Sequence, residues 1–187
     1  MTQQKHFPNG RIVSLRVGDI TQVPADVIVN AANSGLRGGG GVDGAIHRAG
    51  GSDIMRELDA IRAAHGGCPP GSAVSTSAGR LPAQFVFHAV GPMFCGGENQ
   101  EAETLASCYK TCLDMAEEKG IETISFPSIS TGVYGYPVDE AGRIAVHEVT
   151  SYLGRSSSSI QEVMFVLYDS VTFEAYSRAL RSQCTVE

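Results

Sequence analysis

Long apolar segments are absent from this chain of 187 residues. No stretch approaches the roughly 18–20 apolar residues that a membrane-spanning helix needs, and the N-terminal sequence MTQQKHFPNGR lacks the apolar core of a secretory signal. We therefore expect a cytoplasmic protein that does not act at a membrane. Hydrophobic residues make up 42% and charged residues 18% of the chain, which is typical of a globular protein rather than a disordered one.

Basic charge is also scarce. The chain has 14 lysines and arginines against 20 aspartates and glutamates, and its formal net charge is -6. A generic nucleic-acid binder carries a basic surface, so this balance disfavours nucleic acid as a partner and leaves only a local basic patch open. An anionic ligand would have to be held by local geometry, against a mildly repulsive field.

Cysteine patterns for metal or redox chemistry are missing as well. The number of cysteines is odd, no CxxC pair occurs, and no cysteine–histidine cluster has zinc spacing. We expect no metal and no cofactor, and we expect reduced thiols as in other cytoplasmic proteins. The five cysteines are Cys68, Cys95, Cys108, Cys112 and Cys184.

Three familiar catalytic signatures do not occur. The glycine-rich segment is not followed by Gly-Lys-Ser/Thr, and it lacks the acidic residue that the GxGxxG fingerprint requires about 20 positions after its last glycine. ATP hydrolysis and a nicotinamide dinucleotide fold are therefore disfavoured. The GxSxG elbow of α/β hydrolases is also missing, although composition alone leaves a Ser–His–Asp triad open.

Strand and helix patterns alternate along the chain, which predicts an α/β protein with helices on both faces of a sheet. We expect one domain at residues 11–187, after a flexible N-terminal tail at residues 1–10. The strand patterns cover residues 12–17, 26–30, 72–77, 84–90, 121–126 and 163–168, and the helix patterns cover 42–49, 52–64, 101–118, 138–153 and 171–182.

Two loops have the composition of a phosphate-binding surface. Residues 35–44, GLRGGGGVDG, hold six of the 22 glycines, follow a buried strand and precede a helix. Backbone N–H groups without neighbouring Cβ atoms can surround phosphate oxygens, and a helix N-terminus favours the same anion. Residues 128–137, SISTGVYGYP, also lie between a strand and a helix, and Tyr134 and Tyr136 could cover a flat or sugar-like ligand. Together the loops suggest a ligand with two phosphates, although each could also be a plain surface loop.

Polar residues flank the first loop. Asn30 and Asn33 stand at the end of a hydrophobic strand, and Asp43 follows Asn33 by ten positions. An amide can fix a sugar hydroxyl and a carboxylate can orient or deprotonate a water molecule. The alternatives, a turn bond for Asn33 and a helix cap for Asp43, carry equal weight. Asp19 could accept a hydrogen bond from an exocyclic amine, or it could be a cap.

Two histidines have simpler interpretations. His47 follows Asp43 by four residues, so a helix would place both on one face, but a packed or capping histidine is the commoner case. Its neighbour Arg48 reads as a structural or solvated side chain. His88 lies within the apolar strand QFVFHAV and reads as a core histidine with its hydrogen bonds satisfied.

Two segments resemble a known family. Residues 17–51, VGDITQVPADVIVNAANSGLRGGGGVDGAIHRAGG, and residues 128–137 are similar to the two signatures of MacroD-type macrodomains. The resemblance extends from about residue 11 to 182 and is nearest to bacterial YmdB-type O-acetyl-ADP-ribose deacetylases. It implies a three-layer α/β/α sandwich around a mixed, roughly six-stranded sheet.

The resemblance also implies roles for individual residues. Asp19 matches the aspartate that selects adenine, with Ile20 in backbone contact, and Tyr168 matches an aromatic residue that stacks on adenine. Asn33 matches the asparagine at the distal ribose, with Asn30 also near the ligand, and Asp43 matches the catalytic aspartate. The first diphosphate loop would be Gly38, Gly39, Gly40, Gly41 and Val42, and the second would be Ser130, Thr131, Gly132, Val133 and Tyr134.

The expected activity is hydrolysis of an ester on the distal ribose of ADP-ribose. The ester would be an O-acetyl group or the acyl bond to an acidic side chain of a mono-ADP-ribosylated protein, and the protein would act as a monomer. Three alternatives remain open from the sequence: a module that binds ADP-ribose without chemistry, a phosphatase acting on ADP-ribose 1″-phosphate, and a protein-interaction or RNA-binding role.

Overall fold

The computed structural model describes residues 1–155 and 157–183. In these residues one mixed sheet contains seven strands in the order β1-β2-β7-β6-β3-β5-β4. The five inner strands are parallel, whereas β1 and β4 run antiparallel to their single neighbours. The strands are β1 (Thr2–His6), β2 (Ile12–Val17), β3 (Val27–Ala32), β4 (Ala73–Ser77), β5 (Phe85–Val90), β6 (Thr123–Phe126) and β7 (Glu162–Leu167).

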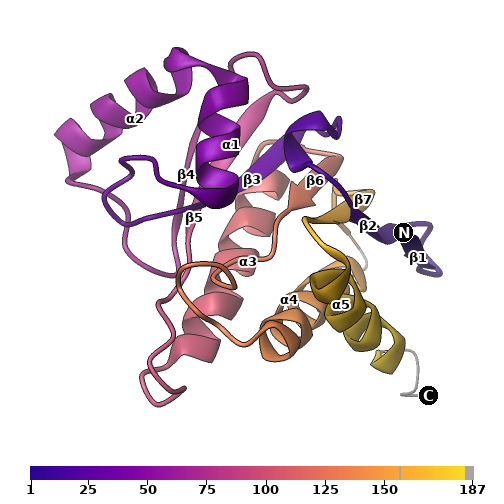
Figure 1. Ribbon diagram of the computed structural model, residues 1–187. Helices are drawn as coiled ribbons and strands as arrows, with labels where there is room; N and C mark the ends of the chain where they lie inside the picture. Colours follow the sequence, from indigo (N-terminus) through magenta and orange to yellow (C-terminus); the bar gives the residue numbers. More distant parts are fainter. Residues whose placement is uncertain (156, 184–187) are drawn as a thin grey trace.

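Helices cover both faces of this sheet, which gives three layers (Figure 1). Helices α1 and α2 pack on one face, and α3, α4 and α5 pack on the other. A short 3-10 helix, η1, follows β2 on the side of α1 and α2. The bounds are η1 (Ile20–Gln22), α1 (Gly41–Gly50), α2 (Ser52–His65), α3 (Glu101–Glu118), α4 (Val138–Leu153) and α5 (Ser170–Ser182).

Alternate residues of the inner strands build two apolar cores. Val27 and Val29 of β3 face the layer of α3, α4 and α5, whereas Ile28 faces α1 and α2. All three are fully buried. Strands buried on both faces are expected to be continuously apolar, which is why the run at residues 26–30 could be read from the sequence.

The predicted fold class is confirmed, and one strand was missed. Residues 2–6 form β1, so the flexible tail expected at residues 1–10 is wrong for this segment. Backbone pairing with β2 holds the strand, in a register that joins Thr2 to Arg16 and His6 to Ile12. The segment TQQKH has no apolar residue, so it shows none of the hydrophobic alternation that reveals a half-buried strand.

The five parallel strands end along one edge of the sheet, and all but β5 lead into a segment that contains predicted ligand residues. Residues 18–20 follow β2, residues 33–40 follow β3, residues 127–137 follow β6 and residues 168–169 follow β7. Ligands of open α/β sheets bind outside the carboxyl ends of the strands. None of the helices in the described part of the chain is long and apolar enough to cross a membrane.

Candidate functional site

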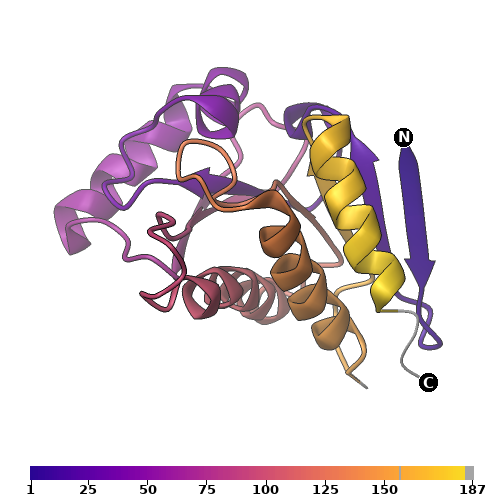
Figure 2. The same ribbon diagram turned by 60° about the horizontal axis from the view of Figure 1, so that its bottom comes forward.

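A cleft of about 890 Å³ opens at this edge of the sheet. Figures 1 and 2 both show the loop before α4 lying beside the loop that precedes α1. Of the residues that the sequence placed at the ligand, Asn30, Gly38 and Tyr136 do not line the cleft, and Tyr136 is buried instead. Those that do are Asp19, Ile20, Asn33, Gly39, Gly40, Gly41, Val42, Asp43, Ser130, Thr131, Gly132, Val133, Tyr134 and Tyr168.

The first glycine loop delivers the N-terminus of α1 to the cleft. Gly40 is the extended N-cap, and Gly38 and Gly41 have positive φ angles of 75° and 56°, a region that suits glycine because it has no Cβ. Within the described residues, the N–H groups of residues 40–43 have no protein acceptor. Unpaired N–H groups at a helix start form a site for an anion.

The second loop presents a similar surface from the opposite side of the cleft. Tyr136 N donates to Ser130 O at 2.9 Å and Gly135 N donates to Gly132 O at 3.0 Å, which closes the loop on itself. Ser130 has a φ of 65°, an uncommon conformation for a residue with a Cβ. The N–H groups of residues 131–133 have no acceptor among the described residues, so they are free to bind a second anionic group.

The segment at residues 91–100 supports the second loop. Phe94 N donates to Tyr134 O at 2.9 Å. The Glu101 carboxylate accepts from the backbone N–H groups of Cys95, at 2.9 Å, and Asn99, at 2.6 Å. These hydrogen bonds, that from Cys95 first, lower the pKa of Glu101 to about 2. The carboxylate therefore stays charged and holds the segment beside the cleft.

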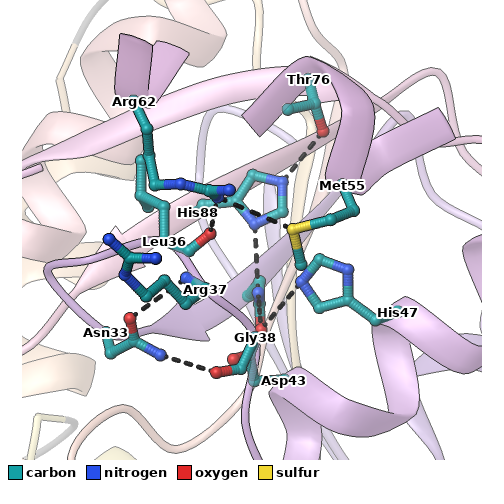
Figure 3. A network of polar contacts seen from close by, with 11 residues as sticks. Asn33, Leu36, Arg37, Gly38, Asp43, His47, Met55, Arg62, Thr76 and His88 are labelled. Atoms are coloured by element: carbon teal, nitrogen blue, oxygen red, sulfur yellow. Dashed lines mark hydrogen bonds and ion pairs between the residues drawn. The ribbon is translucent and has the colours of Figure 1, made fainter. Parts of the chain in front are cut away.

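Asp43 and Asn33 meet at Gly39. A Cβ atom on Gly39 would lie 3.4 Å from Asp43 Oδ2 and 3.9 Å from Asn33 Nδ2. Asp43 is only 5% exposed although it lines the cleft. Its other oxygen, Oδ1, accepts from Asn30 Nδ2 at 2.7 Å and lies 3.2 Å from His47 Nε2. Figure 3 shows Asn33 and His47 approaching this carboxylate region from two sides.

Asn33 and Asp19 each had two possible roles from the sequence, and the structure is compatible with both roles for each residue. Asn33 Nδ2 donates to Gly38 O at 2.9 Å, so this residue makes a turn bond and also lines the cleft. Asp19 Oδ1 accepts from Thr21 N at 2.9 Å and Thr21 Oγ1 at 2.7 Å, which makes it the cap of η1. Because both bonds use Oδ1, Oδ2 is left for a ligand. A loop-closing role therefore does not exclude a binding role.

Tyr168 follows β7 at the end of the cleft next to Asp19. The side chain is 89% exposed, and the next residue, Asp169, caps α5 by accepting from Thr172 N at 2.8 Å. The ring thus stands on a fixed backbone with a free face.

Three residues differ in the structure from the roles expected for them from the sequence. His47 is not simply packed, since its Nε2 lies next to Asp43, and the spacing of four residues was the available signal. Arg48 lines the cleft. Asn30 is fully buried and contacts Asp43 rather than the cleft. His88 is a buried core histidine as expected, and burial lowers its pKa to about 3.

None of the cysteines in the described part of the chain lines the cleft. Cys68, Cys108 and Cys112 are buried and Cys95 is exposed, all four as free thiols. Burial raises the pKa of Cys108 to about 12. Cys184 lies outside the described residues.

Comparison with known proteins agrees with this geometry. The sequence model of the Macro domain matches residues 29–145. A macro domain-containing protein of Caldanaerobacter subterraneus is 54% identical over 167 residues, covering 89% of this chain and 94% of the relative. An O-acetyl-ADP-ribose deacetylase of Citrobacter rodentium is 50% identical over 166 residues, covering 89% of this chain and 93% of the relative.

A solved structure shows the same fold. The structure of a mutant Oceanobacillus iheyensis macrodomain with ADPR is 37% identical and superposes with a TM-score of 0.93, covering 100% of both chains. The family resemblance inferred from the two signature segments is thus confirmed. The chain belongs to the Macro domain family.

Proposed function

We propose that this protein binds ADP-ribose in the cleft and hydrolyses an ester on the distal ribose. The observation that carries the proposal is the position of Asp43, a nearly buried carboxylate in the first turn of α1 that opens onto the cleft beside Asn33. A module that only binds has no need of a carboxylate held in this position by Asn30.

The two glycine-containing loops fit a diphosphate. Residues 40–43 and 131–133 offer unpaired N–H groups from opposite sides, and the dipole of α1 adds positive potential at the same place. Asp19 Oδ2 and the Tyr168 ring fit the amine and the flat face of adenine at one end. Asn33 and Asp43 then fall at the other end, where the distal ribose would lie.

In this arrangement Asp43 orients a water molecule toward the acyl carbon. The water oxygen forms a bond to that carbon, the bond between the acyl carbon and the ribose oxygen breaks, and the ribose oxygen leaves with a proton. Asn33 holds the ribose so that the ester faces the water, since alignment of the reacting atoms supplies a large part of such rate enhancements.

The names of relatives support the substrate class. The protein of Citrobacter rodentium is called an O-acetyl-ADP-ribose deacetylase, as are relatives in Enterobacter and Klebsiella that are 51% identical. We propose O-acetyl-ADP-ribose and mono-ADP-ribosylated acidic side chains as substrates. We also propose that the described residues form one domain, since β1 and β7, from opposite ends of the chain, belong to the same sheet. We further propose that the protein acts as a monomer.

The test compares wild type, Asp43→Ala and the control Asp53→Ala, which removes an exposed carboxylate from the first turn of α2. Turnover of both substrates and calorimetric binding of ADP-ribose are measured side by side. Asp43→Ala should lower turnover by about 10² or more, as is usual for the loss of a catalytic acid or base, and should bind with little change. Tight binding without turnover by wild type would make the protein a binding module, and phosphate release from ADP-ribose 1″-phosphate would make it a phosphatase.

A further inference from the structure

A chain of buried polar groups leads from Asp43 away from the cleft and across the sheet. It consists of Asn30 on β3, His88 on β5 and Thr76 on β4, which are 0%, 0% and 2% exposed and do not line the cleft. Asn30 Nδ2 lies 2.7 Å from Asp43 Oδ1 and 3.1 Å from His88 Nδ1, and His88 Nε2 lies 2.9 Å from Thr76 Oγ1. Figure 3 shows His88 reaching up to Thr76, with the contacts continuing down to Asp43. Buried polar groups cost stability unless each is paired, and apolar side chains would fill the same space without that requirement. Packing alone therefore does not explain this chain of polar groups.

The position of every proton in this chain follows from Asp43. A carboxylate only accepts hydrogen bonds, so the Asn30 atom that faces it is the amide nitrogen. The same nitrogen faces His88 Nδ1, which must therefore accept. The proton of a neutral imidazole is then on Nε2, where it is donated to Thr76 Oγ1.

At the far end of this chain of polar groups, Thr76 forms a hydrogen bond to the backbone. The Thr76 hydroxyl donates to Ser77 O at 2.9 Å, so its oxygen is available to accept from His88. Burial, helped by the nearby His47, lowers the pKa of His88 to about 3. The ring is thus neutral in ordinary buffers, and a proton does not occupy Nδ1, where it would face the amide's own hydrogens.

Among the described residues, only Asp43 and His88 bond the Asn30 amide. Its Oδ1 is buried and has no hydrogen-bond partner among the described residues. Rotating the amide by half a turn would bring this oxygen against the Asp43 carboxylate and would remove both donated hydrogen bonds. The amide nitrogen is therefore held toward Asp43 by two acceptors, the carboxylate itself and His88 Nδ1. The Thr76 hydroxyl keeps Nδ1 an acceptor because it accepts from Nε2–H on the other side of the ring.

We propose that Thr76 and His88 are positioning residues for Asp43: they hold the Asn30 amide as a donor to Oδ1, so that Oδ2, on the side of Gly39, is kept for the attacking water. The inference rests on the proposed hydrolysis for its catalytic meaning. It assigns an effect on turnover to two side chains that do not touch the cleft.

Thr76→Val tests this with little change of volume. Without the hydroxyl, His88 Nε2–H loses its acceptor, and the ring gains by moving the proton to Nδ1, which then turns the Asn30 amide. We expect turnover of O-acetyl-ADP-ribose to fall about tenfold, the scale of one hydrogen bond to a charged group, while ADP-ribose binding changes less than about twofold because the cleft wall is intact. Thr76→Ser keeps the hydroxyl and should restore turnover.

Nitrogen-15 NMR of the histidines supplies a readout that a merely structural role would not move. Wild-type His88 should show a protonated Nε2 and an unprotonated Nδ1, and Thr76→Val should alter that pattern. The matched control is Ser125→Ala, which removes a fully buried hydroxyl from β6, 3.4 Å from Val27 O and outside this chain of groups. The control should leave both the His88 signals and turnover unchanged.

A second pair of variants covers the case in which Thr76→Val does not fold. His88→Asn places a carbonyl oxygen near the position of Nδ1 and should keep more turnover than His88→Leu, which offers no acceptor. The proposal is overturned if wild-type His88 carries its proton on Nδ1, if Thr76→Val keeps full turnover, if it loses binding and turnover in parallel, or if the two His88 variants are equally impaired. If wild type hydrolyses neither substrate, the proposed function fails separately, and the positioning is then tested by the carbon-13 signal of the Asp43 carboxyl, which must shift in Thr76→Val.

Discussion

Removing the Tyr168 ring should weaken ADP-ribose binding without affecting the fold. The ring is 89% exposed at the end of the cleft, so one face is free to stack on a base. Stacking of a base on an aromatic side chain contributes about 1–3 kcal/mol. Because about 1.4 kcal/mol corresponds to a tenfold change, Tyr168→Ala should raise the dissociation constant roughly 5- to 150-fold. The free energy of unfolding should change by less than about 0.5 kcal/mol, as for other exposed positions.

Calorimetry with two ligands makes this prediction specific to the base. ADP-ribose should bind Tyr168→Ala more weakly than wild type, whereas ribose 5-phosphate, which has no adenine, should bind both equally. Tyr168→Phe keeps the ring and should bind as wild type does. Val171→Ala is the matched control, since Val171 is 72% exposed on α5 and does not line the cleft. An equal loss for both ligands, or a loss in the control, would show that the ring does not act by stacking on adenine.

Three further changes test other parts of the site. Asp19→Asn can still cap η1 by accepting from Thr21, but it places an amide group where Oδ2 stood. The preference for ADP-ribose over its hypoxanthine analogue should therefore fall about tenfold in competition calorimetry. An unchanged preference would show that Asp19 does not select the base. Gly44→Ala should favour the helix by about 1 kcal/mol, but its Cβ would lie 2.6 Å from Gly39 O. The first loop must therefore move, and turnover should drop on the order of 10²-fold. Normal turnover would show that the loop can shift without affecting catalysis. The pKa of Glu101 is lowered from 4.5 to about 2 in the folded state, so its contribution to stability is present above about pH 4.5 and is lost as the pH falls toward 2. Glu101→Gln should therefore reduce the loss of stability between pH 7 and pH 3, measured by denaturant unfolding at both values. An unchanged loss of stability in the variant would contradict this.

Much of the site could be predicted from the sequence because its parts are local. The glycines at residues 38–41 stand between a buried strand and a helix, and that order by itself indicates an anion site at a helix start. Asn33 and Asp43 are ten positions apart and are joined by one loop and the first turn of α1, so their approach needs no knowledge of the rest of the fold. The layer arrangement followed from the periodicity of the strands and helices in the same way.

The remainder depends on strand order, which the sequence does not display. Asn30 and His88 are 58 positions apart and become neighbours only because β3 pairs with β5 in the register that joins them. Asn30 was therefore assigned to the ligand, although its side chain is buried beneath α1, where it bonds Asp43. Strand β1 was missed for a related reason, since an edge strand made of polar residues is defined by its backbone partner.

The first loop and the buried chain of polar groups hold Asp43 in different ways. Variants of the two should therefore differ in their effects on binding and on turnover. Asp43 lies in the first turn of α1, and we propose that the same helix start binds the phosphate. A change that moves this loop, such as Gly44→Ala, should therefore disturb phosphate binding and catalysis together. The groups on β3, β5 and β4 reach only Oδ1 of the carboxylate, from the side opposite the cleft, so a change at Thr76 should alter catalysis and leave binding intact. A single carboxylate is thus fixed from two directions, by a helix whose start lines the cleft and by three sheet side chains that do not line it. The two classes of variant should therefore separate affinity from turnover.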